Sequence, residues 1–174
     1  YGVIRDADFF GWLEENVDRL LGLDAEAVLH AVRRSCEIKA DVVAADEREG
    51  GLRAILNYGH TTGHALETLG EYEHLRHGEA VAVGMEAAAA LARAVAGLSE
   101  EDAARQHELL ERLGVPTVIE GADADDVLQK MGQDKKTVGN RLRFILARRI
   151  GEVEIRDDVP PRSVREALLA CGAS

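Results

Sequence analysis

This sequence of 174 residues has few aromatic residues, few prolines and almost no cysteine. Phe, Trp and Tyr together make up 4% of the chain, and alanine is abundant, which favours closely packed helices over a sheet sandwich. The two cysteines, Cys36 and Cys171, lie far apart and form no C-x-x-C pair. We therefore expect free thiols in a reducing, cytoplasmic compartment.

An excess of basic charge is also missing. Lys and Arg number 21 against 32 Asp and Glu, so the formal net charge is −11. Nucleic acids and anionic membranes are bound by basic surfaces, so we expect neither as a partner. No apolar run approaches the ~20 residues of a membrane span. The chain is long enough for one domain with a real core, and its start at Tyr1 without an initiator Met suggests a processed, trimmed or cloned piece.

Helical periodicity dominates the pattern of apolar residues, so the fold class that we predict is mainly α. The segment 78–97 is apolar on most sides, which predicts a central, buried helix. Asp24 is placed to cap a long helix whose apolar positions include Leu29 and Val32. Two period-two segments around Gly151, 141–148 and 152–156, predict a small β-hairpin. The expected helices are 6–21, 25–45, one carrying the histidines through about 69, 78–97, 99–113, 124–132 and 161–171.

The stretch LNYGHTTGHALE, residues 56–67, contains the most suggestive motif. His60 and His64 share one helix face at i, i+4, a spacing found in helical metal sites. Thr61 stands where an H-E-x-x-H metalloprotease has its general-base Glu, so the sequence does not match that protease motif. Gly59 and Gly63 weaken a helix, and the close approach of a ligand or another backbone is one reason to find them there.

Spacing alone leaves open whether these histidines bind metal or are structural. Zinc is commonly held by two His and one carboxylate, and His77 could join the pair. The carboxylate could be Glu67, Glu79 or a group outside the chain. Basic residues beside glycine-rich or helix-end segments would need to converge to bind an anion, and each is otherwise an ordinary solvated charge. They are Lys39, Arg53, Lys135 and Lys136.

Several of these motifs in order resemble the 3-dehydroquinate synthase family over nearly the whole chain. The resemblance implies the mainly helical C-terminal domain, of the dehydroquinate synthase-like or iron-alcohol-dehydrogenase-like type, with an N-terminal NAD-binding domain absent from the chain. It also implies Zn²⁺ or Co²⁺ on His60 and His77, with a third ligand, a Glu, in the segment before Tyr1. The matching residues are Lys39-x6-Asp46-x2-Glu49-x3-Arg53-x3-Asn57-x2-His60-x3-His64, then His77-Gly-Glu79-Ala-Val-Ala-x-Gly-Met85 and Asp134-Lys135-Lys136.

The family converts an anionic sugar phosphate, 3-deoxy-D-arabino-heptulosonate 7-phosphate, to 3-dehydroquinate and phosphate, using NAD and a metal. The resemblance implies that His64 and Glu49 transfer protons, and that the full-length enzyme is a homodimer. It further implies substrate binding by Lys39, Arg53, Asn57 and one of the adjacent residues Lys135 and Lys136. Because the chain is acidic, we expect these cations to cluster in one cleft.

Three other interpretations of the sequence stay open. A sister sugar-phosphate cyclase, of the valiolone or deoxy-inosose synthase type, shares fold, metal and NAD, but its substrate lacks the carboxylate. A related alcohol dehydrogenase would not need the cations Lys39 and Arg53. The chain could also be a non-catalytic helical fragment.

His74 is a competing ligand, although the His77-Gly-Glu79 context favours His77.

Overall fold

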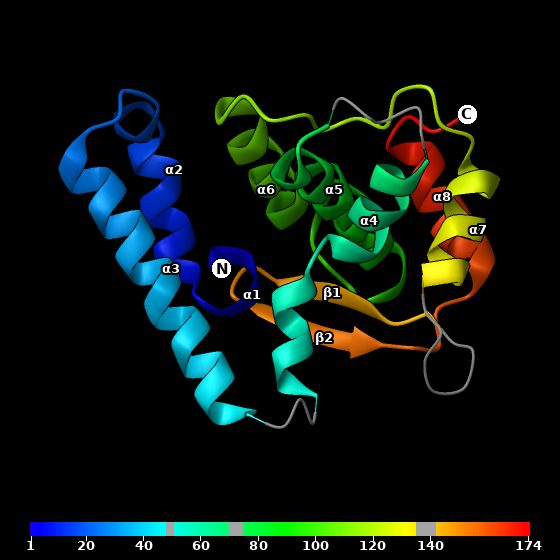
Figure 1. Cartoon of the computed structure of the whole chain (residues 1–174), viewed down its shortest axis with the longest axis horizontal. Coiled ribbons are helices and arrows are strands. Elements are labelled where there is room, and N and C mark those ends of the chain that lie inside the picture. Colours follow the sequence, from blue (N-terminus) through cyan, green and yellow to red (C-terminus); the bar gives the residue numbers. More distant parts are fainter. Residues whose placement is uncertain (48–50, 70–74, 135–141) are drawn as a thin grey trace.

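Helix α5 (His77–Val95) lies at the centre of the molecule, and other elements surround it (Figure 1). The structure is a computed structural model that describes residues 1–47, 51–69, 75–134 and 142–174. Helices α4 (His60–Thr68), α6 (Glu100–Arg112) and α8 (Pro161–Ala170) contact α5, as does strand β1 (Phe144–Arg149). Small side chains cover much of the buried surface of α5, so its neighbours approach closely. The predicted central helix is thus confirmed.

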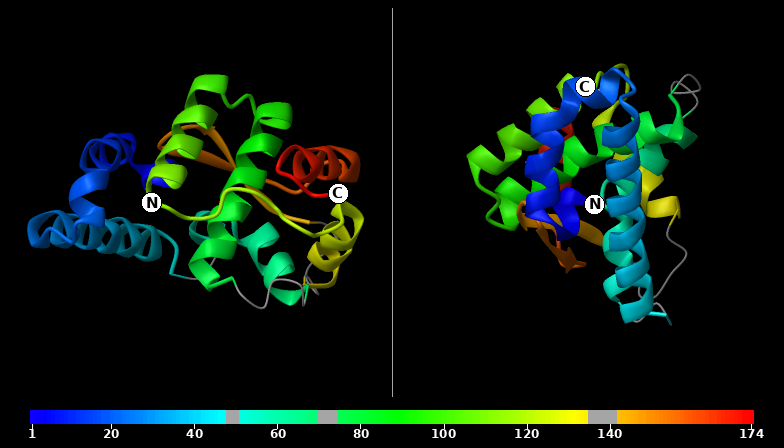
Figure 2. Two further views of the ribbon diagram at one scale, coloured as in Figure 1. Left: turned by 90° about the horizontal axis from the view of Figure 1, so that it is seen from above. Right: turned by 90° about the vertical axis from the view of Figure 1, so that its left-hand side faces the viewer.

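The N-terminal part forms a helical hairpin that projects from this core (Figures 1 and 2). It comprises α2 (Ala7–Leu21) and α3 (Ala25–Ala45), whereas the short α1 (Gly2–Arg5) before them packs against β1 and the strand paired with it. The Asp24 carboxylate accepts the Ala27 amide at 2.9 Å, which confirms the predicted cap of α3.

The expected apolar face of α3 is only partly buried. Leu29 is 67% exposed and Val32 is 56% exposed, whereas Ile38 and Val42 are buried. The reason is tertiary: α3 contacts α2 and η1 but extends beyond the core, so part of its apolar face has no neighbour in the described residues.

The helix predicted to carry the histidines is broken. A 3-10 helix, η1 (Leu52–Asn57), is followed by a sharp turn at Gly59 and only then by α4. Gly59 has φ +78°, a left-handed conformation that suits glycine. A Cβ on Gly59 would lie 2.7 Å from the Val81 carbonyl oxygen, so α5 itself presses against the turn.

The C-terminal part follows the predicted order. Ser99 accepts the Asp102 amide at 3.0 Å and caps α6, and α7 (Ala124–Asp134) comes next. Strands β1 and β2 (Glu152–Arg156) pair antiparallel, with Ile145 opposite Ile155, and Gly151 in their turn has φ +88°. In the described part of the chain, no helix is both long and apolar enough to cross a membrane.

Candidate metal centre and substrate cleft

Three histidines come together where α4 meets the start of α5. One potential ligand atom from each of His60, His64 and His77 lies within 4.8 Å of the others. The ring centroids are 5.4 Å apart for His60–His64, 5.4 Å for His60–His77 and 5.8 Å for His64–His77. Helix α4 places the first two one turn apart, and the packing of α4 on α5 brings in the third.

Hydrogen bonds orient two of these rings. The His60 Nδ1 lies 3.1 Å from the Tyr58 carbonyl oxygen, and the His77 Nδ1 lies 3.0 Å from Glu67 Oε1. Both partners are acceptors, so each Nδ1 carries the proton in the neutral ring and Nε2 keeps a lone pair. Histidine ligands of metals usually have such a partner on the other ring nitrogen. Imidazole nitrogens of this kind suit Zn²⁺ or Co²⁺.

The electrostatics of His60 also suit a metal ligand. Burial lowers the pKa of His60, and the neighbouring His64 and His77 lower it further, against the opposing effects of the Tyr58 carbonyl and Glu67. A lowered pKa favours the neutral imidazole, which is the form that binds a metal ion.

The two carboxylates considered from the sequence have other contacts. Glu67 holds the ring of His77, and Glu79 accepts the Arg76 amide at 2.7 Å, which caps the start of α5. In the described residues, the histidine cluster contains no carboxylate.

A cleft of about 540 Å³ lies beside His60. Its basic residues come from three separate segments: Lys39 from α3, Arg53 from η1 and Arg143 from just before β1. The predicted clustering of Lys39 and Arg53 is therefore confirmed. The cleft is lined by Tyr1, Lys39, Gly51, Arg53, Ala54, Leu56, Asn57, His60 and Arg143.

The loop that presents Arg53 is held by an acidic side chain. Asp46 Oδ2 accepts the backbone amides of Gly51 and Arg53, each at 2.9 Å. These bonds fix the start of η1 and so the backbone that carries Arg53 and, one turn later, Asn57.

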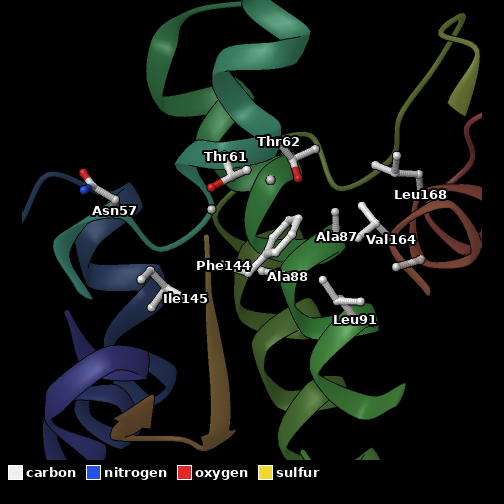
Figure 3. A pocket seen from close by; sticks show the side chains of 13 residues that line it. Asn57, Thr61, Thr62, Ala87, Ala88, Leu91, Phe144, Ile145, Val164 and Leu168 are labelled. Atoms are coloured by element: carbon white, nitrogen blue, oxygen red, sulfur yellow. The ribbon is translucent and has the colours of Figure 1, made fainter. Parts of the chain in front are cut away.

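A second cavity lies behind the histidine helix, between α4, α5, β1 and α8 (Figure 3). Thr61 and Thr62 lie on one side of it, and Phe144 and Leu168 line the others. At about 20 Å³ it has room for about one water molecule. A sugar phosphate cannot enter it, whereas the cleft beside His60 has room for one and is lined by basic side chains, which makes it the candidate substrate site.

Comparison with known proteins identifies the family of the chain. The family model described as "3-dehydroquinate synthase C-terminal" matches residues 1–137. The chain belongs to this family. The 3-dehydroquinate synthase of Acidithiobacillus ferrooxidans is 46% identical over 170 residues, which are 98% of the chain and 47% of the relative. That of Desulforamulus reducens is 47% identical over 169 residues, 97% of the chain and 47% of the relative. The chain thus spans about half the length of the curated relatives it matches.

Solved structures of sugar-phosphate cyclases share the fold of this dehydroquinate synthase domain. A 2-epi-5-epi-valiolone synthase from Streptomyces hygroscopicus subsp. jinggangensis, with NAD⁺ and Zn²⁺ bound, aligns with a TM-score of 0.87 at 24% identity, covering 98% of the chain and 48% of that protein. A 2-deoxy-scyllo-inosose synthase complexed with carbaglucose-6-phosphate, NAD⁺ and Co²⁺ aligns with a TM-score of 0.69 at 27% identity, covering 81% of the chain and 40% of that protein.

Some positions of the family motif fall outside the described residues. They are Glu49, Lys135 and Lys136. His74, which is not part of the motif, also lies outside the described residues. Their assignments stay predictions.

Two features of this dehydroquinate synthase domain were missed from the sequence. Arg143 lines the cleft, and its carbonyl accepts the Thr61 hydroxyl at 3.2 Å, which ties the approach to β1 to the histidine helix. Tyr58, whose carbonyl contacts His60, forms a buried hydrogen bond with Gln106. Arg143 stands in the period-two segment that predicted the hairpin, and that pattern carries no signal for the cleft. The Tyr58–Gln106 pair is 48 residues apart, and nothing in the sequence marks it.

Proposed function

We propose that the chain forms the metal- and substrate-binding domain of a 3-dehydroquinate synthase, which converts 3-deoxy-D-arabino-heptulosonate 7-phosphate to 3-dehydroquinate and phosphate. One observation carries the proposal: His60 belongs both to the histidine cluster and to the wall of the cationic cleft. The identity of 46% and 47% to curated 3-dehydroquinate synthases supports this activity over that of the sister cyclases.

The proposed metal ligands are His60 and His77, with a Glu from outside the chain as the third. Zn²⁺ or Co²⁺ at this position would polarise the substrate hydroxyl that NAD⁺ oxidises. The third imidazole, His64, is the proposed proton-transfer group, since imidazole exchanges protons near neutral pH. The cluster geometry is compatible with this division of roles, because all three rings are close enough to face one bound substrate.

The proposed anion-binding residues are Lys39 and Arg53, joined by one of Lys135 and Lys136. A guanidinium binds a carboxylate or phosphate through two parallel hydrogen bonds, and an ammonium group acts as a point charge. Asn57, which lines the cleft together with Lys39, Arg53 and His60, would bind substrate hydroxyls. Glu49 is the proposed second proton-transfer residue.

The rest of the enzyme completes the proposal. The part of the protein that the chain lacks relative to its relatives would contain the NAD-binding domain, and the full-length enzyme would be a cytoplasmic homodimer. Electron and hydride chemistry would then belong to the interface between the two domains, while this chain would hold the substrate and the metal.

The test is phosphate release from 3-deoxy-D-arabino-heptulosonate 7-phosphate with NAD⁺ and either Co²⁺ or Zn²⁺. We expect the longest native polypeptide that carries this sequence to release phosphate, and its His60→Ala variant to be about 10²-fold slower or worse because a metal ligand is lost. The variant His30→Ala is the control, since the His30 ring packs against the Trp12 ring, with centroids 4.2 Å apart, and lies outside the histidine cluster.

Equal rates for the native protein and His60→Ala would contradict the proposed metal centre. A metal-loaded native protein that leaves this substrate unchanged but acts on a heptulose 7-phosphate without the carboxylate would instead be a sister cyclase.

A further inference from the structure

The carbonyl that orients His60 belongs to a residue that is anchored from behind. Tyr58 is 5% exposed, and its hydroxyl donates to Gln106 Oε1 at 2.7 Å. Gln106 is 3% exposed and donates from Nε2 to the Met85 carbonyl at 3.0 Å. This chain of bonds joins α6 and α5 to the turn between η1 and α4.

A buried tyrosine–glutamine pair stabilises a core less than apolar side chains of similar size would. Each polar group loses its water on burial, and the net gain from one hydrogen bond is only about 1 kcal/mol. A phenylalanine and a leucine would fill the space with no polar group to satisfy. The polar pair fixes the orientation of the Tyr58 ring, because a satisfied buried hydrogen bond allows only one placement of that ring.

The other side of the Tyr58 carbonyl is constrained by close packing. Gly59 lies against α5, and a Cβ on Gly84 would come within 1.9 Å of the Gly59 carbonyl oxygen. The peptide unit between Tyr58 and His60 is therefore held by α5 on one side and by the Tyr58 side chain on the other.

We propose that the Tyr58–Gln106 hydrogen bond positions the metal ligand His60, by fixing the Tyr58 carbonyl that accepts the hydrogen bond from His60 Nδ1. Tyr58 and Gln106 are positioning residues: they belong neither to the histidine cluster nor to the lining of the cleft, and they act through the orientation and tautomer of His60. The inference rests on the proposed function only in requiring that His60 bind a metal.

The test measures Co²⁺ affinity by competition with a chelator, in the longest native polypeptide that carries this sequence. We expect Tyr58→Phe and Gln106→Leu each to weaken Co²⁺ binding about 10-fold, the lower end of the range for lost outer-shell partners. We also expect the visible absorption bands of the bound Co²⁺ to shift, because the angle of the His60 ligand changes. Ile119→Val is the control: Ile119 is fully buried, and its loss of one methyl lowers stability without touching the turn.

The double variant Tyr58→Phe with Gln106→Leu separates positioning from stability. Removing both polar partners should recover part of the free energy of unfolding, because no buried group of the pair is left unsatisfied. Co²⁺ affinity should stay as weak as in Tyr58→Phe, because the Tyr58 carbonyl is still unanchored.

Two results would overturn the inference. One is Co²⁺ affinity that stays within about twofold of native in both single variants, well below the outer-shell range. The other is affinity that recovers in the double variant in step with stability. If the His60→Ala variant bound Co²⁺ as tightly as the native protein, the proposed metal centre would be overturned as well. Tight Co²⁺ binding without formation of 3-dehydroquinate would count against the proposed function alone.

Discussion

At the scale of single residues, glycines decide how closely the histidine helix approaches α5. Gly63 and Gly84 lie where the two helices cross: a Cβ on Gly63 would lie 3.0 Å from the Ala80 carbonyl oxygen, and one on Gly84 would lie 1.9 Å from the Gly59 carbonyl oxygen. The glycines beside His60 and His64 are therefore explained by the approach of another backbone, one of the reasons the sequence suggested.

Gly84→Ala tests this contact. The added methyl meets backbone on the facing element rather than a flexible side chain, so α4 must move away from α5. We expect a loss of about 3 kcal/mol or more in the free energy of unfolding, together with weaker metal binding because His60 and His77 separate. Denaturant unfolding and a Co²⁺ titration would measure the two effects.

The matched control is Gly11→Ala on α2. A Cβ there meets nothing within 4 Å, so the helix should gain up to about 1 kcal/mol from the better propensity of alanine. If Gly84→Ala were as stable as Gly11→Ala, close packing of α4 on α5 would not be what selects glycine.

At the scale of elements, one carboxylate joins two helices of the projecting hairpin. Asp6 Oδ1 accepts the Phe9 amide at 2.9 Å and caps α2, and Oδ2 accepts from Arg34 Nε of α3 at 2.7 Å. Partial burial by itself would raise the pKa of Asp6, but the hydrogen bonds from Phe9 and Arg34 outweigh it, so the pKa lies below its usual value of 3.8.

The lowered pKa of Asp6 sets the direction of a pH effect. Because the folded state holds this carboxylate ionised more firmly than the unfolded chain does, Asp6 stabilises the fold above pH 3.8, and that contribution is lost as the pH falls through the lower folded value. We expect Asp6→Ala to cost about 1 kcal/mol or more near neutral pH, and less as the pH falls. Urea unfolding at several pH values would measure the difference.

Glu15→Gln is the control for net charge, since Glu15 is an exposed residue of the same helix. A constant difference between native and Asp6→Ala over the whole acid range would show that Asp6 acts only through packing.

At the scale of the whole molecule, a metal site at the histidine cluster would depend on the tertiary structure. His60 and His64 belong to α4 and His77 to α5, so an ion bound by the cluster joins two helices of the core. Such a site exists only in the folded state, and its binding free energy adds to stability.

We therefore expect Zn²⁺ to raise the free energy of unfolding, by about 2.7 kcal/mol when its free concentration is 100 times its Kd. His60→Ala should abolish the response, and His30→Ala, on the projecting hairpin, should keep it. Thermal unfolding with Zn²⁺ and with a chelator would measure the effect. A full response in His60→Ala would place the stabilising ion elsewhere.

The arrangement of the charged side chains is also a property of the whole molecule. The chain carries a net charge of −11, yet Lys39, Arg53 and Arg143 line one cleft. Clefts concentrate the field of the charges that line them, so an anion can be attracted locally by an acidic protein.

Local patterns in the sequence determined most of the helices, their caps and the hairpin, because period, cap and turn preferences act over a few neighbouring residues. The order of motifs also determined the family, and with it the candidate ligands His60 and His77. The i, i+4 pairing of His60 and His64 needed only the geometry of one helix turn.

Only the tertiary structure decided the rest. The helix breaks at Gly59 because α5 presses on it, and Leu29 and Val32 stay exposed because α3 extends past the core. The cleft joins segments as far apart as Lys39 and Arg143, and Gln106 reaches Tyr58 across 48 residues. Such contacts depend on how elements distant in sequence pack together, and no local pattern in a single sequence specifies that packing.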